Sequence, residues 1–359
     1  MLALAAAVSA LTAVLVATSG SARARPTCFG KTATIVGTNH RDVISGTRGK
    51  DIIAARGGND VVRAKNTRVN HGKDIVCGGG GDDSITGNNE ANTLIGEQGN
   101  DTIKAGPGND LVVGDNADPQ GAEGGKTGRD TLNGTGGKDF VVGDNYASGN
   151  ASGASPDRDV LGLDNGDKVI GDSVSLTGNA SGGATDRVAG ADGNDLVVGD
   201  SYAPRGIASG NGDDSKKKIN KKAGLNAGPG NDIEVGDNYT VSGKALGGGR
   251  DELQSADGGD NDAKCKPHTC DDVFYGDNYA ASCGPRGTQA ALRCQGRLTH
   301  GGAPDRLTTD QGNDFLNGGD PNDPELRGNG DKCAGGSGRD QAARCEYNYK
   351  DVESVVKAS

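Results

Sequence analysis

Aspartate recurs at nine-residue intervals over long stretches of this chain, and it is the residue type whose spacing could support chemistry. The pattern is clearest in residues 96–104 (GEQGNDTIK) and 105–113 (AGPGNDLVV), where position six is Asp and position eight is aliphatic. Carboxylate oxygens and the carbonyl oxygens of glycine-rich turns are hard ligands, of which Ca²⁺ takes about six to eight with loose geometry. The spacing therefore predicts a series of calcium ligands.

The same frame places further ligands along the chain, with one five-residue insertion between Asp60 and Asp74. We expect calcium ligands at Asp42, Asp51, Asp60, Asp74, Asp83, Asn92, Asp101, Asp110, Asp130, Asp139, Asp195, Asp232, Asp314 and Asp340. An aliphatic residue follows two positions after each of the first eight, at Ile44, Ile53, Val62, Val76, Ile85, Leu94, Ile103 and Val112.

Some residues depart from the pattern and are expected to weaken individual sites. His40 replaces a turn glycine, Asn92 replaces a carboxylate and Arg56 takes a position meant for a small residue. Glu234 stands where an aliphatic core residue is expected. The series as a whole is predicted more firmly than any one of its sites.

The elements that must position these ligands are turns and short strands. Glycine at positions one, two and four is expected to permit positive φ angles and to let carbonyl oxygens turn toward an ion. Only 32% of the residues are hydrophobic, against about 45–50% in a typical domain, so a large packed core is excluded. Disorder is the alternative, but a disordered chain has no need of fixed intervals. We expect stacked turns with position eight pointing into a narrow, continuous core.

The nonapeptides resemble the RTX, or haemolysin-type, calcium-binding repeat, whose pattern is G-G-x-G-x-D-x-U-x with U a large apolar residue. Copies in register span most of residues 37–343. The resemblance implies an all-β fold, a parallel β-roll or β-helix solenoid, with Ca²⁺ between turns on the same side. It also implies that partners lie two repeats apart, so that Asp42 shares an ion with the turn of Asp60, Asp83 with that of Asp101, and Asn92 with that of Asp110.

A longer period begins at residue 114. Gly-Asp-Asn or Gly-Asp-Ser, often followed by Tyr, starts at residues 114, 143, 171, 199, 236 and 276 and leads into Gly/Ala/Ser-rich segments. We interpret these as loops that leave one edge of the solenoid, because insertions in repeat proteins tend to map to one face. Either this face binds a partner, or each Tyr only covers the edge of the core.

Residues 1–24 resemble a secretory signal, with an apolar run and an A-x-A-like site at 22–24. In an exported chain the eight cysteines suggest disulfides, grouped as Cys28 with Cys77, Cys265 with Cys270, Cys283 with Cys294, and Cys333 with Cys345. The first and last groups are expected to staple the ends of the repeat. A zinc site at residues 265–270 is the alternative for the second group, but it lacks a second Cys/His pair.

These features divide the chain into a signal peptide at 1–24, an N-terminal cap at 25–36 and uninterrupted repeats at 37–113. Longer repeats with Gly-Asp-Asn-Tyr-type loops follow at 114–282, then an irregular insertion with repeat turns at 283–330, and a final turn with a C-terminal cap at 331–359.

The net charge of −11 and the absence of a basic stripe argue against nucleic acid as a partner, since the one basic run, residues 216–222, resembles a solvated loop. No segment beyond residue 24 is apolar enough to span a membrane. The chain has neither an H-E-x-x-H nor a G-x-S-x-G motif, and its histidines are only His40, His71, His268 and His300. We expect a secreted, non-enzymatic protein that folds on binding Ca²⁺. The alternative is an adhesin that binds a cell-surface or extracellular polysaccharide through the Gly-Asp-Asn-Tyr loops.

Overall fold

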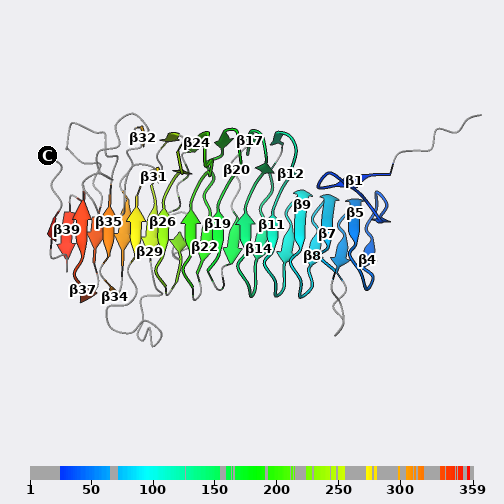
Figure 1. Cartoon of the computed structure of the whole chain (residues 1–359), viewed down its shortest axis with the longest axis horizontal. Helices are drawn as coiled ribbons and strands as arrows, with labels where there is room; N and C mark the ends of the chain where they lie inside the picture. The colour runs from blue at the N-terminus through cyan, green and yellow to red at the C-terminus, as the bar shows by residue number, and fades with distance from the viewer. Residues whose placement is uncertain are drawn as a thin grey trace, which may run out of the picture.

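The chain forms an elongated stack of short strands in a computed structural model (Figure 1). The structure describes residues 25–64, 72–125, 127–153, 159–162, 164, 166–190, 193–210, 212, 214, 224–228, 230–242, 244–247, 250–254, 272–276, 279–280, 298–299, 305–309, 311–312, 314–318, 332–335, 337–343, 345, 347–350 and 354–355. All regular elements in these ranges are β-strands. The expectation of an all-β parallel solenoid is confirmed.

One long parallel sheet runs the length of the molecule. Its strands, in spatial order, are β3 (Ile35–Val36), β5 (Ile52–Gly57), β7 (Ile75–Gly80), β9 (Thr93–Gln98), β11 (Leu111–Val113), β15 (Phe140–Val142), β19 (Lys168–Ile170), β23 (Leu196–Val198), β26 (Ile233–Val235), β30 (Val273–Tyr275), β35 (Phe315–Asn317), β38 (Gln341–Ala343) and β40 (Ser354–Val355). We call it the shared sheet, because it contributes to two hydrophobic cores.

A second parallel sheet faces the shared sheet and is built from the alternate repeats. Its strands are β4 (Val43–Ser45), β6 (Val61–Arg63), β8 (Ser84–Thr86), β10 (Thr102–Lys104), β14 (Thr131–Asn133), β18 (Val160–Gly162) and β22 (Arg187–Ala189). The stack continues with β25 (Leu225–Asn226), β29 (Glu252–Gln254), β33 (Arg306–Thr308), β36 (Lys332–Ala334) and β39 (Tyr347–Lys350), since Val188 N–H donates to the Gly224 carbonyl at 2.9 Å.

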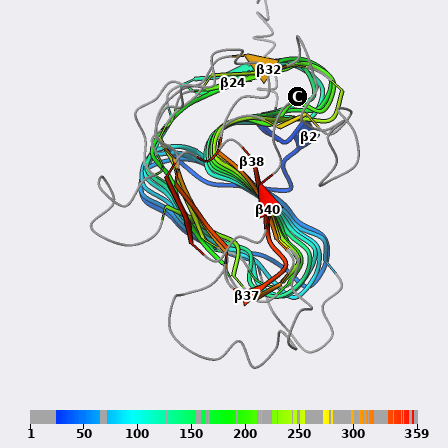
Figure 2. The same cartoon turned by 90° about the vertical axis from the view of Figure 1, so that its left-hand side faces the viewer.

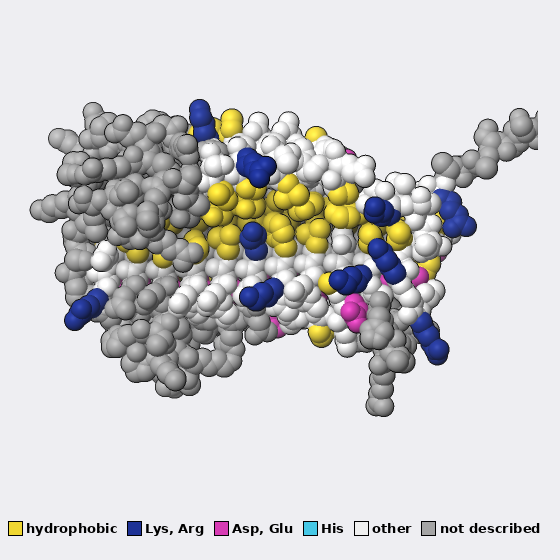
Figure 3. All heavy atoms as spheres, viewed as in Figure 1, with side chains coloured by type: hydrophobic (Ala, Val, Ile, Leu, Met, Phe, Trp, Pro, Cys, Tyr) yellow, Lys and Arg dark blue, Asp and Glu magenta, His cyan; other side chains and the backbone are white. Residues whose placement is uncertain are grey.

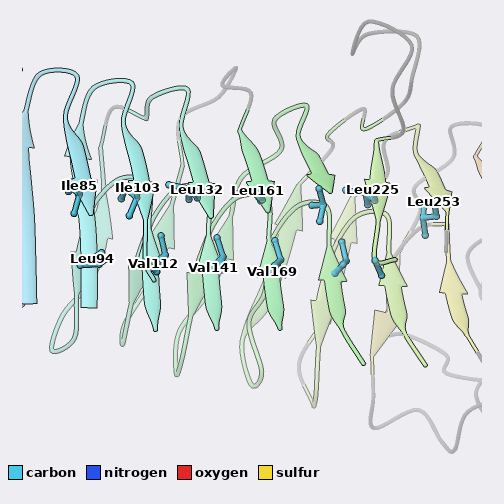
Figure 4. Close-up of a cluster of buried hydrophobic side chains, with 14 of the residues drawn as sticks. Ile85, Leu94, Ile103, Val112, Leu132, Val141, Leu161, Val169, Leu225 and Leu253 are labelled. Atoms are coloured by element: carbon cyan, nitrogen blue, oxygen red, sulfur yellow. The ribbon is translucent and has the colours of Figure 1, made fainter. Parts of the chain in front are cut away.

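The first core lies between these two sheets, where the eighth positions of successive repeats meet. Figure 4 shows two rows of side chains pointing toward each other, with Ile85, Ile103 and Leu132 in one row and Leu94 and Val112 in the other. All eight aliphatic residues predicted for residues 37–113 are buried here. Most strands of these two sheets contribute a single side chain to this core, which explains how so few hydrophobic residues can support the fold.

The Gly-Asp-Asn inserts form a second lobe on the opposite face of the shared sheet (Figure 2). The inner strands of this lobe are β12 (Ala117–Asp118), β16 (Tyr146–Ala147), β20 (Val174–Ser175), β27 (Tyr239–Thr240) and β31 (Tyr279–Ala280), with Tyr202 bridging Val174 and Tyr239. Its outer strands are β13 (Glu123–Gly124), β17 (Ala151–Ser152), β21 (Ala180–Ser181), β24 (Ile207–Gly210), β28 (Lys244–Gly247) and β32 (Leu298–Thr299).

A second core lies under this lobe. Val113, Val142 and Ile170, at the ninth position of their repeats, are buried between the shared sheet and the inserts. Tyr202 is buried and stacks on half-buried Tyr239, with ring centroids 5.2 Å apart. The tyrosines therefore cover apolar surface, as the passive interpretation of the loops expects.

The two ends carry additional structure. β1 (Thr27–Cys28) and β2 (Lys31–Thr32) form an antiparallel hairpin, tied to β7 by the Cys28–Cys77 disulfide. At the other end Cys333 bonds Cys345, and β34 (Gln311–Gly312) pairs with β37 (Ser337–Gly338). The expectation that the first and last cysteine groups staple the two ends is confirmed. The signal segment 1–24, residues 65–71, the basic run 216–222 and the cysteines between 265 and 294 lie outside the described residues.

Candidate calcium ladders

The predicted ligands lie in two columns, which we call ladders. Each coil of the roll has two turns, and each ladder runs along one of these two sets of turns. In both, the carboxylate Oδ1 of one residue accepts the backbone N–H of its neighbour in the preceding coil, at 2.5–3.2 Å. The first ladder contains Asp42, Asp60, Asp83, Asp101, Asp130, Asp159, Asp186, Asp214, Asp251 and Asp305. The second contains Asp51, Asp74, Asn92, Asp110, Asp139, Asp167, Asp195, Asp232, Asp272, Asp314 and Asp340.

Every residue predicted from the sequence belongs to one of these ladders. The three pairs implied by the family resemblance are direct neighbours: Asp42 N–H donates to Asp60 and Asp83 N–H to Asp101, both at 2.7 Å, and Asn92 N–H donates to Asp110 at 2.6 Å. Calcium binding by these particular residues remains a prediction.

Sequence reasoning missed Asp159, Asp167, Asp186, Asp214, Asp251, Asp272 and Asp305. The inserts break the nine-residue frame around them, so alignment on that frame passed them over. Except at Asp214, an apolar residue that is buried follows two positions later, as Leu161 follows Asp159 and Phe274 follows Asp272. The Asp-x-apolar signal could have found them.

The second carboxylate oxygen is the atom that points to a ligand. Oδ2 is buried without a hydrogen-bond partner in Asp60, Asp83, Asp101, Asp110, Asp139, Asp195, Asp214 and Asp232, each of which is at most 3% exposed. A buried, unsatisfied polar group costs about 1–3 kcal/mol, and more when it is charged. Such a row of oxygens is stable only if protons or cations satisfy it.

The space beside each Oδ2 is shaped by the glycine at position one. A Cβ on Gly96 would collide with both Asp101 Oδ2 and the carbonyl oxygen of Gly114, and a Cβ on Gly78 would collide with Asp83 Oδ2. These oxygens therefore converge on the same small space. This corrects one expectation: positive φ occurs at positions two and four, as at Gly79 and Gly81, whereas Gly78 and Gly96 do not have it. Glycine at position one serves to leave room.

Burial raises the pKa of these carboxyl groups, and the backbone N–H that each accepts lowers it by a smaller amount. Repulsion from neighbouring aspartates adds to the rise at Asp83, Asp101, Asp139 and Asp195. The pKa is raised to about 8 for Asp101 and Asp195, to about 7 for Asp83, Asp139 and Asp232, and to about 6 for Asp110. Desolvation is the largest cause in every case, because burial disfavours the charged form. In the absence of cations the ladders thus hold protons much more readily than exposed aspartates do.

The first turns satisfy their carboxylates internally. Asp42 Oδ2 accepts the Thr38 backbone N–H at 2.6 Å, and Thr47 donates to Asp51 in the same way. The predicted weakness at His40 falls on this turn, where Asp42 is only half-buried. These two ladder positions therefore have a protein donor at the oxygen that is buried without a hydrogen-bond partner in Asp83 and Asp101.

The turn of Asn92 uses amide groups as donors. Asn92 Nδ2 donates to the Glu90 carbonyl at 2.6 Å, and Asn88 Nδ2 donates to both Asp74 Oδ2 and the Gly72 carbonyl, at 2.8 and 2.9 Å. In this turn an amide NH₂ group lies among carboxylate and carbonyl oxygens. In the turn of Asp101 the corresponding oxygens border an open space beside Gly96. The predicted weakness at Asn92 therefore has a direct structural counterpart.

Two further predicted departures have different outcomes. Arg56 adopts a φ of 88° at position two and its side chain is exposed. Glu234 is fully buried in register with Val197 and Phe274, and its carboxylate accepts the Ala227 N–H. A charged side chain thus stands among the core residues of the shared sheet.

The residues fit calcium through mixed ligands. Within the described ranges no group of three or more His, Cys, Asp or Glu side chains gathers closely enough to hold a metal. Backbone carbonyl oxygens must supply most ligands, which suits the flexible, oxygen-rich coordination of Ca²⁺ better than the strict octahedron of Mg²⁺. In the same described part of the chain, no helix is long and apolar enough to cross a bilayer.

Comparison with known families agrees with this geometry. The family model for the RTX calcium-binding nonapeptide repeat (4 copies) matches residues 34–65, 70–85, 86–118, 125–145 and 301–323. A search of curated proteins finds no match.

Proposed function

Because this chain carries RTX nonapeptide repeats, which bind Ca²⁺, we propose that it is a secreted structural or binding protein whose β-roll folds when calcium fills the two ladders. The observation that carries the proposal is the row of buried Oδ2 atoms without partners. Without a cation the charged ladders oppose folding, and with one they become the contacts that hold successive coils together. Secretion is part of the proposal because residues 1–24 resemble a signal peptide.

The proposal includes no enzymatic activity. The chain has no H-E-x-x-H or G-x-S-x-G motif, and most of the aspartates of the described region belong to the two ladders. Extracellular calcium modules work at about 10⁻⁴–10⁻³ M, so folding would follow export.

Calcium titration of the purified chain tests this function. At pH 8 we expect β-type circular dichroism to be low in EDTA and to rise cooperatively as calcium reaches the millimolar range, while magnesium at the same concentration has a much smaller effect. A β-type spectrum at pH 8 that is identical in EDTA and in calcium would contradict calcium-dependent folding.

A second candidate, binding of a cell-surface or extracellular polysaccharide, is favoured by one surface. A groove of about 610 Å³ is lined by residues of the shared sheet, including Phe140, Leu196 and Ile233, with Asn194 and Asn231 among its polar groups. Figure 3 shows the apolar stripe along the long axis. Lys168 lies over Phe140, with Nζ 5.3 Å from the ring centroid. An apolar platform with amide donors suits a sugar chain.

Polysaccharide capture by the calcium-loaded protein tests this candidate. Phe140→Ala should weaken capture, whereas Val43→Ala, at a residue 63% exposed on β4, should not. Equal capture by both variants would count against the groove.

A further inference from the structure

A third column of aspartates runs through the molecule outside both nonapeptide ladders. It consists of Asp115, Asp144, Asp172, Asp200 and Asp237, the aspartates of the Gly-Asp-Asn and Gly-Asp-Ser segments, and we call it the insert column. Each backbone N–H donates to the carbonyl of the next member, at 2.9–3.2 Å. All five residues are at most 1% exposed. They stand at position two of their turns, where the uninterrupted repeats have Gly79 or Glu97.

The insert column lies close to the first ladder. The pKa of Asp200 is raised well above its ordinary value, first by burial and then by repulsion from Asp237, Asp172, Asp214 and Asp251. Two of those four, Asp214 and Asp251, belong to the first ladder. Buried carboxylates of the insert column and of the first ladder therefore lie near one another.

The residue that follows each aspartate of the insert column is either asparagine or serine. Asn145 and Asn238 fill the space with an amide: their Nδ2 atoms donate to the Ser152 and Leu246 carbonyl oxygens, at 2.8 and 2.9 Å. Ser173 and Ser201 take the same place in register. Their side chains are fully buried and their Oγ atoms have no hydrogen-bond partner.

The serine hydroxyl of Ser173 faces a carboxylate. A Cβ placed on Gly153 would collide with Asp144 Oδ2 and lie 3.3 Å from Ser173 Oγ, so both oxygens border the same small space. One coil further, Gly182 takes the place of Gly153. A Cβ there would collide with Cβ of Asp172 and lie 3.2 Å from its Oδ1, in the coil where Ser201 replaces Ser173. The Asp172 carboxylate also accepts the Ala184 N–H, at 3.1 and 3.2 Å from its two oxygens. Serine is shorter than asparagine, so Ser173 and Ser201 leave space beside the insert column in two successive coils.

We propose that the insert column binds two further divalent cations, matched best by Ca²⁺, one beside Asp144 and Ser173 and one beside Asp172 and Ser201. Hydroxyl, carboxylate and carbonyl oxygens are all calcium ligands, and an asparagine NH₂ group would exclude the ion by taking its place. These sites lie outside the nonapeptide pattern and do not depend on which ladder residues bind calcium.

The experiment counts calcium ions per chain by native mass spectrometry at saturating calcium, with circular dichroism as the check on folding. Ser173→Asn and Ser201→Asn should each lose one ion and the double variant two, because the asparagine NH₂ group would fill the space of the ion. Both variants should fold, since asparagine already stands at the equivalent positions Asn145 and Asn238. Ser84→Asn, at an exposed serine on β8, is the control and should keep the wild-type number.

The reverse change tests the same sites without relying on the serine variants. Asn238→Ser should open the space beside Asp200 Oδ2, where the Gly182 carbonyl also points, and the variant should gain one ion. If the wild type folds with calcium but neither the serine variants nor Asn238→Ser changes the count, the insert column does not bind cations. If the wild type does not respond to calcium at all, calcium-dependent folding has failed instead.

Discussion

At the scale of single residues, an interior ladder aspartate such as Asp101 has two separable tasks. Its Oδ1 atom accepts the Asp83 N–H from the preceding coil, and its Oδ2 atom and the Gly114 carbonyl oxygen border a space that has no Cβ. Asn92 shows that the first task does not require charge, because its Oδ1 accepts the Asp74 N–H at 3.2 Å. The second task requires a carboxylate, because in asparagine the atom at the Oδ2 position is an NH₂ group, which donates hydrogen bonds and does not bind a cation.

Asp101→Asn should therefore keep the backbone hydrogen bond from Asp83 and lose calcium. In EDTA we expect the variant to be more stable than wild type by about 1–3 kcal/mol, because a buried carboxylate without a partner has been removed. In saturating calcium it should be less stable and hold fewer ions. Thermal melts in both buffers, together with ion counting, measure this.

The matched control is Asp82→Asn, since Asp82 is an exposed aspartate that belongs to neither ladder. Its ion count should equal that of wild type. Asp101→Asn with an unchanged ion count and an unchanged response to calcium would remove Asp101 from the proposed ligands.

At the scale of the elements, the turn and the strand of each repeat were predictable to different degrees. The spacing of Asp and an aliphatic residue predicted the strand and its inward face, as at Ile103. It did not predict that the shared sheet is covered on both faces. That information was present at position nine, which is Val113, Val142 or Val198 in strands of the shared sheet but Lys104 or Asn133 in the facing sheet.

The rest of the candidate site could not be read from a nine-residue frame. The inserts move Asp159 and Asp167 out of phase, and only folding brings them back into line with Asp130 and Asp139. The positions of the Oδ2 atoms without partners depend on which turns supply a donor, such as Thr38 or Asn88. These local contacts depend on side-chain reach, which residue spacing does not specify.

Gly96→Ala tests the turn as an element. The new methyl group would collide with Asp101 Oδ2 and the Gly114 carbonyl, so we expect a loss of about 1–3 kcal/mol in calcium, typical of an overpacked site, and a weaker calcium midpoint. Gly80→Ala is the control, because a Cβ there meets nothing within 4 Å. Denaturant unfolding at fixed calcium compares the two variants, and equal stabilities would show that the space at position one is not needed.

At the scale of the whole molecule, two acidic ladders extend along the roll and the insert column runs beside part of the first. Their repulsion is collective, so calcium and protons compete for the same oxygens and either can relieve it. Most strands add a single side chain to the central core, so we expect apolar burial alone not to overcome this repulsion. Folding of the entire chain should therefore follow the occupancy of the ladders.

The pH dependence without calcium follows from the raised pKa values. In the folded chain Asp101 and Asp195 have a pKa of about 8 and Asp83, Asp139 and Asp232 of about 7, against 3.8 for an ordinary aspartate. Between about pH 4 and pH 8 the folded state thus binds more protons than the unfolded state, so its stability falls as pH rises. In EDTA we expect β-type circular dichroism at pH 4.5 that disappears as the pH is raised through 6 to 8, whereas calcium restores it at pH 8. Equal spectra in EDTA at pH 4.5 and pH 8 would show that repulsion among the buried carboxylates does not control folding.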